Sequence, residues 1–403
     1  MTKKISVGVT VILIAAAIII SSVTTLFVVF SSYNNLLVDL PQRADQYLKL
    51  AEIDELIRSN YYGSIDTESI DDALASGFIN GLKDDHSYYI SSDDIASFNN
   101  FLNGKSDGIG INAYYDFSGP YLTVSYVYAG SPAEASAIDV SCIITSVNGK
   151  NVSDENYEEL IDEICNTTGK KIKITYADSP ESADIKTAEL VSGYEMQSCH
   201  FLVNDNVGYI RLSAFYESTY SAFIDAMKNM VDNKISSVII DLRNSSGYNF
   251  TEAAKIIDYI VPVGTEGTGA IFTAKNLGGE TVSQFVSDSV ASNLSFAVLI
   301  NSRTEGAAEL VACDLKDFGK AILIGENTSG HGTMQQLFEL QDGGYAFVTV
   351  AEIYPYISSS FNNTGIAPDV EILTSESFKN KLGTDNFDND EQYSAAVKYL
   401  TGK

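Results

Sequence analysis

The second half of the chain alternates short apolar runs with segments of helical spacing. Residues 297–300 form a continuous apolar run, which is typical of a strand buried on both faces. Apolar residues recur every three or four positions from Gly306 to Phe318, and Gly319 follows as a stop signal. A second apolar run covers 321–324. This order of strand, helix and strand predicts a right-handed parallel crossover.

A further apolar run at 237–244 predicts another buried strand, and helices are predicted at 218–231 and 251–260. The strands expected at 208–213 and 343–350 are implied by the family resemblance given below. The expected fold class is therefore α/β, with a parallel-sheet core and crossover helices.

The pattern before this core is different. Helical spacing at 44–58 and 70–82 predicts two N-terminal helices. Residues 105–190 instead contain short alternating strands and glycine-rich turns, with one helix predicted at 157–164. The dipeptide Asn148-Gly149 is a hairpin signal. We therefore expect a β-rich domain inserted before the core.

An uncharged apolar segment from Ser6 to Phe30 is longer than the roughly 20 residues that cross a bilayer core. Lys3 and Lys4 precede it, so the positive-inside rule predicts a cytoplasmic N-terminus and extracytoplasmic domains. A cleaved signal peptide would have a shorter apolar core and a small-residue cleavage site. We find no clean site, so the favoured interpretation is an uncleaved single-pass anchor in the cell membrane.

These patterns divide the chain into successive parts. The expected parts are a cytoplasmic tail at 1–5, a transmembrane anchor at 6–30, a tether at 31–42, a helical region at 43–104 that packs on the core, the β-rich domain at 105–190, the core domain at 191–375 and an acidic C-terminal tail at 376–403.

The charge balance excludes one class of partner. The chain has 25 basic and 53 acidic residues, for a net charge of −28. Nucleic-acid binding requires clusters of Lys and Arg against phosphates, so we expect no nucleic-acid partner.

Four cysteines, Cys142, Cys165, Cys199 and Cys313, are compatible with disulfides or with buried thiols. Cys142 with Cys165 is the pair predicted within one domain. Cys199 precedes His200 on a predicted strand, where neighbours point to opposite faces, so we do not expect a catalytic pair. The three histidines have no spacing typical of a zinc site, and we expect no metal and no cofactor.

The segment from Phe296 to Gln336 resembles the catalytic segment of the carboxyl-terminal processing peptidases, also called tail-specific proteases. That family has the pattern V-N-x-x-S-A-S-A-S-E followed by T-F-G-K-G-T-V-Q, which supplies a nucleophilic serine and a lysine general base. Aligned on Glu309, the serine position is Gly306 and the lysine position is His331. Gln335 falls where the family has its base-supporting glutamine.

This resemblance implies that the catalytic dyad is not intact, because a Ser-Lys mechanism requires a hydroxyl and an amine. The sequence around Asp241 resembles the family motif D-L-R-N-N-P-G-G, whose glycine N–H groups help to form the oxyanion hole. Gly247 keeps one glycine of this loop, and Tyr248 replaces the other. We expect the tyrosine to enter the pocket or redirect the loop.

Other motifs extend the resemblance over about residues 45–375. Residues 84–89 resemble D-P-Y-S-x-Y with His86 in place of the proline, and 363–369 match G-I-x-P-D. The β-rich domain resembles a PDZ domain. In such a domain, a loop like Gly108-Ile109-Gly110-Ile111 directs backbone N–H groups at the terminal carboxylate of a peptide.

Three functions remain open. The favoured one is a membrane-anchored pseudopeptidase that binds peptide C-termini or unfolded substrates, with an active paralogue as a further candidate partner. The alternative is an active serine-type endopeptidase that processes protein C-termini with a displaced nucleophile, for which Ser302, Thr304 and Ser329 are the candidates. Each would require the turn to be rebuilt, and small displacements already cost large factors in rate. The third is a structural cell-surface protein.

Overall fold

The computed structural model of the 403-residue chain describes residues 40–115, 117–128, 130–204, 206–261, 270–287, 292–341, 343–374 and 387–402. The predicted anchor at 6–30 lies outside these residues. Among the helices that are described, none is both long and apolar enough to cross a bilayer. The chain divides into two compact units between Asp71 and Asp72.

The first unit contains a long helix, α2 (Leu40–Asn60), and the start of α3 (Thr67–Asn80). Both confirm the helices predicted at 44–58 and 70–82, with earlier starts. Arg58 pairs with Asp54 one turn before it on α2, an exposed pair of the kind that stabilises a helix only slightly. Asp66 accepts a hydrogen bond from the backbone N–H of Glu68 at the start of α3.

The second unit is organised around a six-stranded sheet whose strands follow the order β10-β11-β12-β15-β16-β19. All neighbours are parallel except β10 and β11. The predicted crossover is confirmed, because its two strands pair in parallel. The bounds are β10 (Cys199–Asn204), β11 (Val207–Leu212), β12 (Ser237–Asp241), β15 (Ser295–Ile300), β16 (Ala321–Gly325) and β19 (Val370–Glu371).

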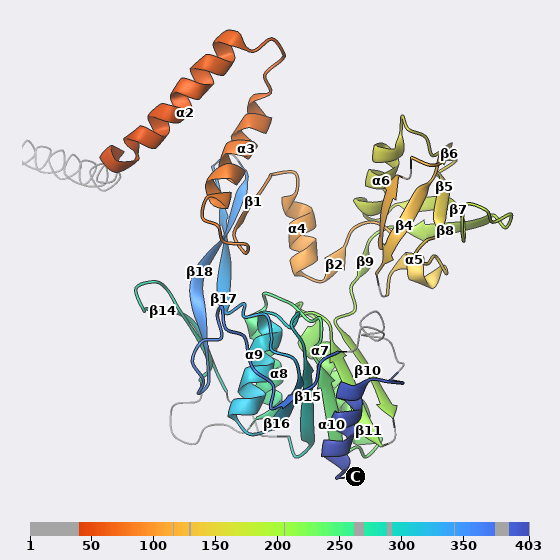
Figure 1. The fold of residues 1–403 in the computed structure, drawn as a ribbon, viewed down its shortest axis with the longest axis vertical. Helices are drawn as coiled ribbons and strands as arrows, with labels where there is room; N and C mark the ends of the chain where they lie inside the picture. The colour runs from red at the N-terminus through yellow and green to blue at the C-terminus, as the bar shows by residue number, and fades with distance from the viewer. Residues whose placement is uncertain are drawn as a thin grey trace, which may run out of the picture. The chain divides into compact units, whose positions relative to one another are not determined.

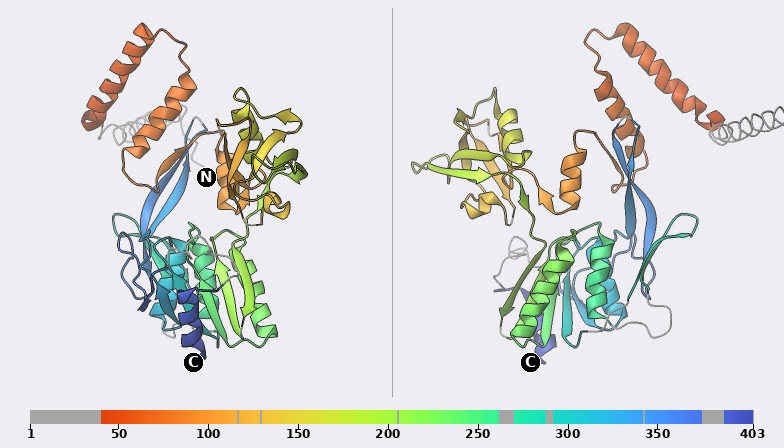
Figure 2. Two further views of the ribbon diagram at one scale, coloured as in Figure 1. Left: turned by 45° about the vertical axis from the view of Figure 1, so that its right-hand side comes forward. Right: turned by 180° about the vertical axis from the view of Figure 1, so that it is seen from behind.

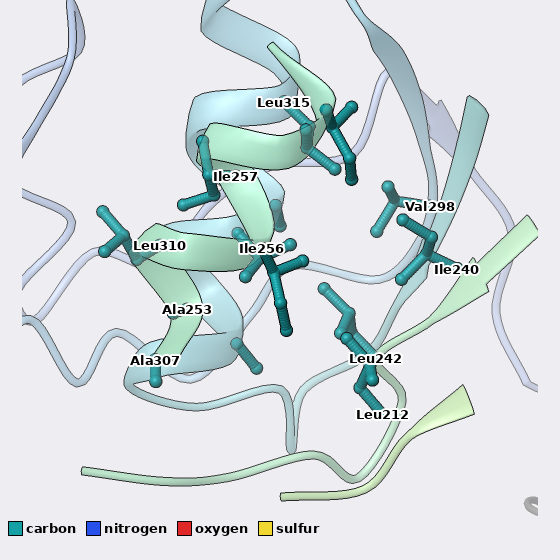
Figure 3. Close-up of a cluster of buried hydrophobic side chains, with 14 of the residues drawn as sticks. Leu212, Ile240, Leu242, Ala253, Ile256, Ile257, Val298, Ala307, Leu310 and Leu315 are labelled. Carbon is teal, nitrogen blue, oxygen red and sulfur yellow. The ribbon is translucent and has the colours of Figure 1, made fainter. Parts of the chain in front are cut away.

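Both faces of this sheet are covered by helices, which explains why its strands are continuous apolar runs. One face packs against α7 (Thr219–Asp232), α8 (Phe250–Ile260) and α9 (Ala307–Asp317). Figure 3 shows this cluster, with Ile240 and Val298 of the sheet on one side and Ile256 and Leu310 on the helices at the other. The opposite face packs against α10 (Glu391–Thr401) through Tyr393 (Figure 1, Figure 2).

Helix α10 belongs to the segment expected as an acidic tail. Its N-cap residue, Asp390, is buried and forms an ion pair of 2.8 Å with Arg243, which follows β12. Gln392 also accepts a hydrogen bond from the Arg243 guanidinium. The last helix is therefore a part of the core.

A second sheet, which is antiparallel, follows the order β1-β18-β13-β14, with β17 paired to β18. Among the described strands β17 pairs with β18 alone, so its other edge is free. The bounds are β1 (Tyr88–Ile90), β13 (Ala270–Lys275), β14 (Thr281–Val286), β17 (Thr333–Glu339) and β18 (Tyr345–Pro355). A helix, α4 (Ile95–Leu102), follows β1, and the short pair β2 (Lys105–Ser106) and β9 (Tyr194–Glu195) flanks the inserted domain in the chain.

The inserted domain has its own apolar core and a sheet in the order β3-β4-β5-β7-β8, with β6 paired to β5. The predicted β-rich domain is confirmed. Its edge strand β3 packs against α6. The bounds are β3 (Ile111–Tyr115), β4 (Leu122–Val127), α5 (Pro132–Ala135), β5 (Ile143–Val147), β6 (Lys150–Asn151), α6 (Tyr157–Cys165), β7 (Lys171–Ala177) and β8 (Lys186–Val191).

All four cysteines are free thiols, so the pairing proposed for Cys142 with Cys165 is not formed. The two sulfur atoms face different neighbours: the Cys142 thiol lies against Asp139 and the Cys165 thiol against the carbonyl of Ile111. Burial raises the pKa of the Cys165 thiol to about 11. It raises the pKa of the Cys199 thiol to about 12.

Candidate active site at the start of helix α9

The turn between β15 and α9 is built around a glycine. Gly306 is the N-cap of α9, with φ 63° and ψ −117°, in a region that side chains rarely adopt. A Cβ atom there would lie 2.5 Å from the carbonyl oxygen of Gly247. That carbonyl accepts a hydrogen bond from the N–H of Ala307. The turn therefore has the sharp strand-to-helix form that presents a nucleophile in other enzymes, but it has no side chain to present.

Glu309 in the first turn of α9 holds the surrounding loops in place. Its buried carboxylate accepts hydrogen bonds from the N–H groups of Gly306, Gly330 and His331 and from the hydroxyl of Thr328. Burial raises the pKa of this carboxyl, and the four donors only partly oppose that shift. Glu309 is thus a structural acceptor that fixes His331 opposite Gly306.

His331 is buried between two glycines of the loop that leads into β17. Its Nδ1 atom lies 3.1 Å from a carboxylate oxygen of Glu305, and its Nε2 atom lies 3.3 Å from the amide nitrogen of Gln335. The hydrogen bond with His331 holds the pKa of the Glu305 carboxyl below its usual value. The positions predicted from the sequence, 306, 331 and 335, therefore do lie together.

His86 joins this group from a distant part of the sequence. Its ring stacks on the His331 ring, with centroids 3.3 Å apart and planes 5° from parallel. Ser87 attaches the loop to β18, because its hydroxyl accepts a hydrogen bond from the N–H of Thr349. Burial, and then the neighbouring His331, lower the pKa of the His86 imidazole. Neither His86 nor Glu305 was predicted in the site. Counted along the motif D-P-Y-S-x-Y, His86 stands at the tyrosine and Asp85 at the proline, so the assignment of His86 to the proline position was wrong, but a histidine within this motif was a usable signal.

The loop after β12 forms the wall of the site. The ring of Tyr248 lies 5.6 Å from that of His331 and 5.7 Å from that of Phe347. Burial, followed by the charge of Glu305, raises the pKa of Tyr248. Gly247 and Tyr248 border a largely apolar cavity of about 460 Å³. Its other walls include residues from α4, from the loop after β11, from β17 and from β18: Phe101, Leu102, Phe215, Tyr216, Met334, Leu337 and Phe347.

The three candidate hydroxyls occupy different environments. The hydroxyl of Thr304 is buried, donates to the carbonyl of Leu242 and accepts from the N–H of Asn301. It is therefore fixed to the backbone. Ser302 and Ser329 are exposed on the surface.

Two backbone N–H groups of the proposed carboxylate-binding loop, residues 108–111, form hydrogen bonds within the inserted domain itself. The N–H of Gly108 donates to the carbonyl of Thr167 at 2.7 Å, and the N–H of Ile109 donates to the carbonyl of Ile164 at 2.9 Å. The N–H groups of Gly110 and Ile111 are thus the better candidates to receive a peptide carboxylate.

Comparison with known families agrees with this architecture. Residues 206–372 match peptidase family S41, and residues 98–177 match the PDZ domain family. The core thus matches the S41 family, and the inserted domain matches the PDZ family. The chain is 26% identical over 328 residues to the "Probable CtpA-like serine protease" of Staphylococcus aureus (strain N315). The matched region covers 81% of this chain and 64% of that protein.

A second relative with the same printed name, from Staphylococcus saprophyticus, is 24% identical over 81% of this chain and 66% of its own length. The chain thus spans a little under two thirds of the length of these curated relatives. A solved structure described as a "Putative S41 protease from Bacteroides fragilis" has a TM-score of 0.54 and 17% identity, over 85% of this chain and 91% of that one. At that identity, the match concerns the fold.

Proposed function

We propose that this chain is a membrane-anchored S41 protein that binds peptides and does not hydrolyse them by a serine mechanism. The observation that supports the proposal is Gly306, which occupies the nucleophile's position in a turn whose conformation favours glycine. Acyl transfer needs an activated hydroxyl at that point. His331 lies where a base would act, but it has no hydroxyl at 306 to activate.

Two features support retained peptide binding. The first is the apolar cavity of about 460 Å³ beside β17, which is large enough for a large apolar side chain. Because one edge of β17 is free, an extended peptide can add to it as a further strand and direct alternate side chains toward the cavity. The second is the PDZ domain, whose edge strand β3 lies beside α6 in the arrangement that receives a peptide strand.

We further propose that residues 6–30 anchor these domains on the extracytoplasmic side of the cell membrane. The motive is the uncharged apolar segment preceded by Lys3 and Lys4. Protease added to intact cells should digest most of the chain. Complete protection until the membrane is opened would overturn this orientation.

The main experiment measures cleavage and binding on the same purified full-length chain. We expect no hydrolysis of unfolded protein or of peptides with apolar C-termini, and we expect measurable binding of those peptides by fluorescence polarisation. Amidation of the peptide C-terminus should weaken the PDZ contribution, because the amide lacks the charge that backbone N–H groups stabilise. Wild-type turnover that disappears in Ser329→Ala or Thr304→Ala would instead establish a displaced nucleophile.

The cavity is tested by two substitutions on neighbouring positions of β17. Leu337 lines the cavity, whereas Phe338 points to the other face of the strand and is exposed. Leu337→Ser should weaken the binding of apolar-tailed peptides about tenfold, and Phe338→Ser should leave it within about twofold. Equal effects of the two substitutions would remove the cavity from the binding site.

A further inference from the structure

We infer that His86, Glu305 and His331 form a binding site for a divalent transition metal, with Zn²⁺ as the best-matched ion. In the part of the chain that the structure describes, these residues are the one group of three or more His, Cys, Asp or Glu side chains whose ligand atoms converge, all within 4.8 Å of one another. The inference goes beyond the proposed function, because metal binding requires neither peptide binding nor the absence of hydrolysis.

The spacing of the ligand atoms fits zinc. Zinc binds imidazole nitrogen and carboxylate oxygen at about 2.0–2.2 Å, which separates two ligands of a tetrahedral ion by roughly 3.3 Å. The Nδ1 atom of His331 and the Oε1 atom of Glu305 are 3.1 Å apart. The separation of these two atoms therefore matches that of two ligands of one ion, which would replace the hydrogen bond between them.

The third ligand needs a small rearrangement. The two imidazole rings stack face to face, whereas an ion must lie in the plane of each ring that binds it. His86 therefore has to tilt so that one nitrogen turns toward Nδ1 of His331. This residue is only partly buried and its loop is held through Ser87 rather than through the ring, so the ring can turn without disturbing β18.

The donor set selects the class of metal. Two imidazoles and one carboxylate suit Zn²⁺ and other first-row ions, whereas Mg²⁺ and Ca²⁺ prefer sites made of oxygen alone. Three protein ligands leave a fourth position of a tetrahedral ion open. Gly306 borders the site without a side chain, since a Cβ atom there would lie 3.7 Å from Nδ1 of His331.

Gln335 is suited to support the metal-bound form of His331. When Nδ1 binds the ion, the proton of the ring is on Nε2 and needs an acceptor. Among the described residues the buried Oε1 atom of Gln335 has no hydrogen-bond partner, and rotation of the amide by half a turn would place it where Nε2 of His331 can donate to it. Gln335 would thus be a positioning residue that acts through His331.

The ligand positions are among the positions at which this chain departs from the peptidase motifs given above. Counted along those motifs, His86 stands at a tyrosine, Glu305 at an alanine and His331 at a lysine, in three separate segments of the chain. A vestigial cleft would accumulate unrelated residue types at these positions. Here each change introduces a side chain that binds transition metals, and the fold brings all three together.

The test titrates Zn²⁺ into the purified full-length chain after removal of metal with a chelator, in competition with a chromogenic indicator. We expect one ion per chain. His86→Ala, Glu305→Gln and His331→Ala should each weaken binding at least tenfold. His200→Ala is the matched control, because His200 is an exposed histidine on β10 and belongs to no metal-ligand group of the described residues; its affinity should equal that of the wild type.

Two further measurements test the inference without the buried His331→Ala variant, should that variant not fold. Zn²⁺ should raise the melting temperature of the wild type and of His200→Ala but not of His86→Ala or Glu305→Gln, since only a folded site binds the ion. Among the wild type, His86→Ala and Glu305→Gln, only the wild type should give the intense visible absorption of Co²⁺ in a low-coordinate site. Wild-type binding no tighter than that of His86→Ala, or the same thermal shift in both, would overturn the inference.

Discussion

Two clusters of ionisable side chains lie in the second unit, and they use their polar atoms differently. In the first, Arg243 donates to both oxygens of Asp241, to both oxygens of Asp390 and to Gln392, and all four side chains are almost completely buried. In the second, His86, Glu305 and His331 share few hydrogen bonds, and their ligand atoms lie within 4.8 Å of one another.

This difference distinguishes a cluster that stabilises the fold from one that can bind a ligand. Burial raises the pKa of Asp241, but the charge of Arg243 more than offsets this and leaves it below its usual value. Both carboxylates of that network pair with the single guanidinium, and Asp241, Asp390 and Gln392 take up its N–H donors, so the network is closed to a ligand. The second cluster keeps nitrogen and oxygen lone pairs, and His331 contacts Tyr248 and Gln335, which line the cavity of about 460 Å³. An ionisable cluster with unused ligand atoms next to a cavity is the better candidate for function.

The largest expected effect breaks the first cluster. Asp390→Ala removes a carboxylate that pairs with Arg243, whose side chain is about 1% exposed. It also removes the N-cap of α10. We expect the free energy of unfolding of the core to fall by about 3–5 kcal/mol, because Arg243 keeps Asp241 but loses one of its two buried charge partners and two hydrogen bonds, and α10 loses its cap. Hydrogen exchange of β12 and β15 amides measures this for the core separately from the PDZ domain.

Glu391→Ala is the matched control for this substitution. Glu391 lies next to Asp390 in the first turn of α10 and is exposed. Its removal should cost no more than about 1 kcal/mol, through a weaker interaction with the helix dipole. Similar losses for the two variants would contradict the view that the network, rather than helix capping in general, holds α10 to the sheet.

A second prediction concerns the two ends of α9. Gly306 and Gly319 flank this helix with almost equal φ values of 63° and 64°, but a Cβ atom meets the Gly247 carbonyl at the first and open space at the second. Gly306→Ser should therefore lower the free energy of unfolding by about 2–4 kcal/mol, from strain plus the close contact. Gly319→Ser should cost about 1 kcal/mol, from the positive φ alone. Equal losses of stability for the two variants would mean that the loop at Gly247 moves to accommodate the new side chain without a cost in free energy.

The same turn illustrates what the sequence could predict. Helical spacing and the closing glycine predicted 306–318, and α9 spans Ala307–Asp317, because a buried amphipathic helix needs that pattern to pack. The apolar runs likewise predicted β15 and β16. The alignment of Gly306 with His331 on Glu309 also describes neighbours in the structure, since Glu309 bonds to both backbones.

Two features could not be predicted from local pattern. His86 lies in a loop before β1, and only the pairing of β1 with β18 brings that loop to His331. Asp390 lies in an acidic segment, where composition indicates solvent, yet it is buried against Arg243. In both cases a long-range contact decides the environment of the side chain, and neither periodicity nor composition records such contacts.

A third prediction compares two aspartates of α9. Asp314 is buried, and one of its carboxylate oxygens has no hydrogen-bond partner among the described residues. Burial raises its pKa well above the usual value. Between the ordinary aspartate pKa and this raised one, the unfolded chain loses its proton first, so stability falls as pH rises. Asp314→Asn should therefore be more stable than the wild type by about 1–2 kcal/mol at pH 8, and by less at pH 5.

Asp317 provides the contrast for Asp314. Its carboxylate accepts hydrogen bonds from the N–H groups of Ile357 and Ser358 and from the Ser358 hydroxyl. Asp317→Asn should destabilise the protein by about 1 kcal/mol, because one acceptor becomes a donor. Melting curves of both variants at pH 5 and pH 8 test the prediction; a stability gap for Asp314→Asn that does not widen with pH would refute it.

The smallest expected effect concerns His86 and sharpens the contrast between the clusters. Without metal, His86→Ala removes one stacking contact of a partly buried ring, which should cost about 0.5–1 kcal/mol, several-fold less than Asp390→Ala. With excess Zn²⁺ the difference between wild type and His86→Ala should widen, because only the wild type gains binding free energy. Urea unfolding followed by hydrogen exchange of β17 and β18 measures both states. If His86→Ala costs as much as Asp390→Ala without metal, the histidine stack is a structural element of the core, and the contrast between a closed network and an open site fails.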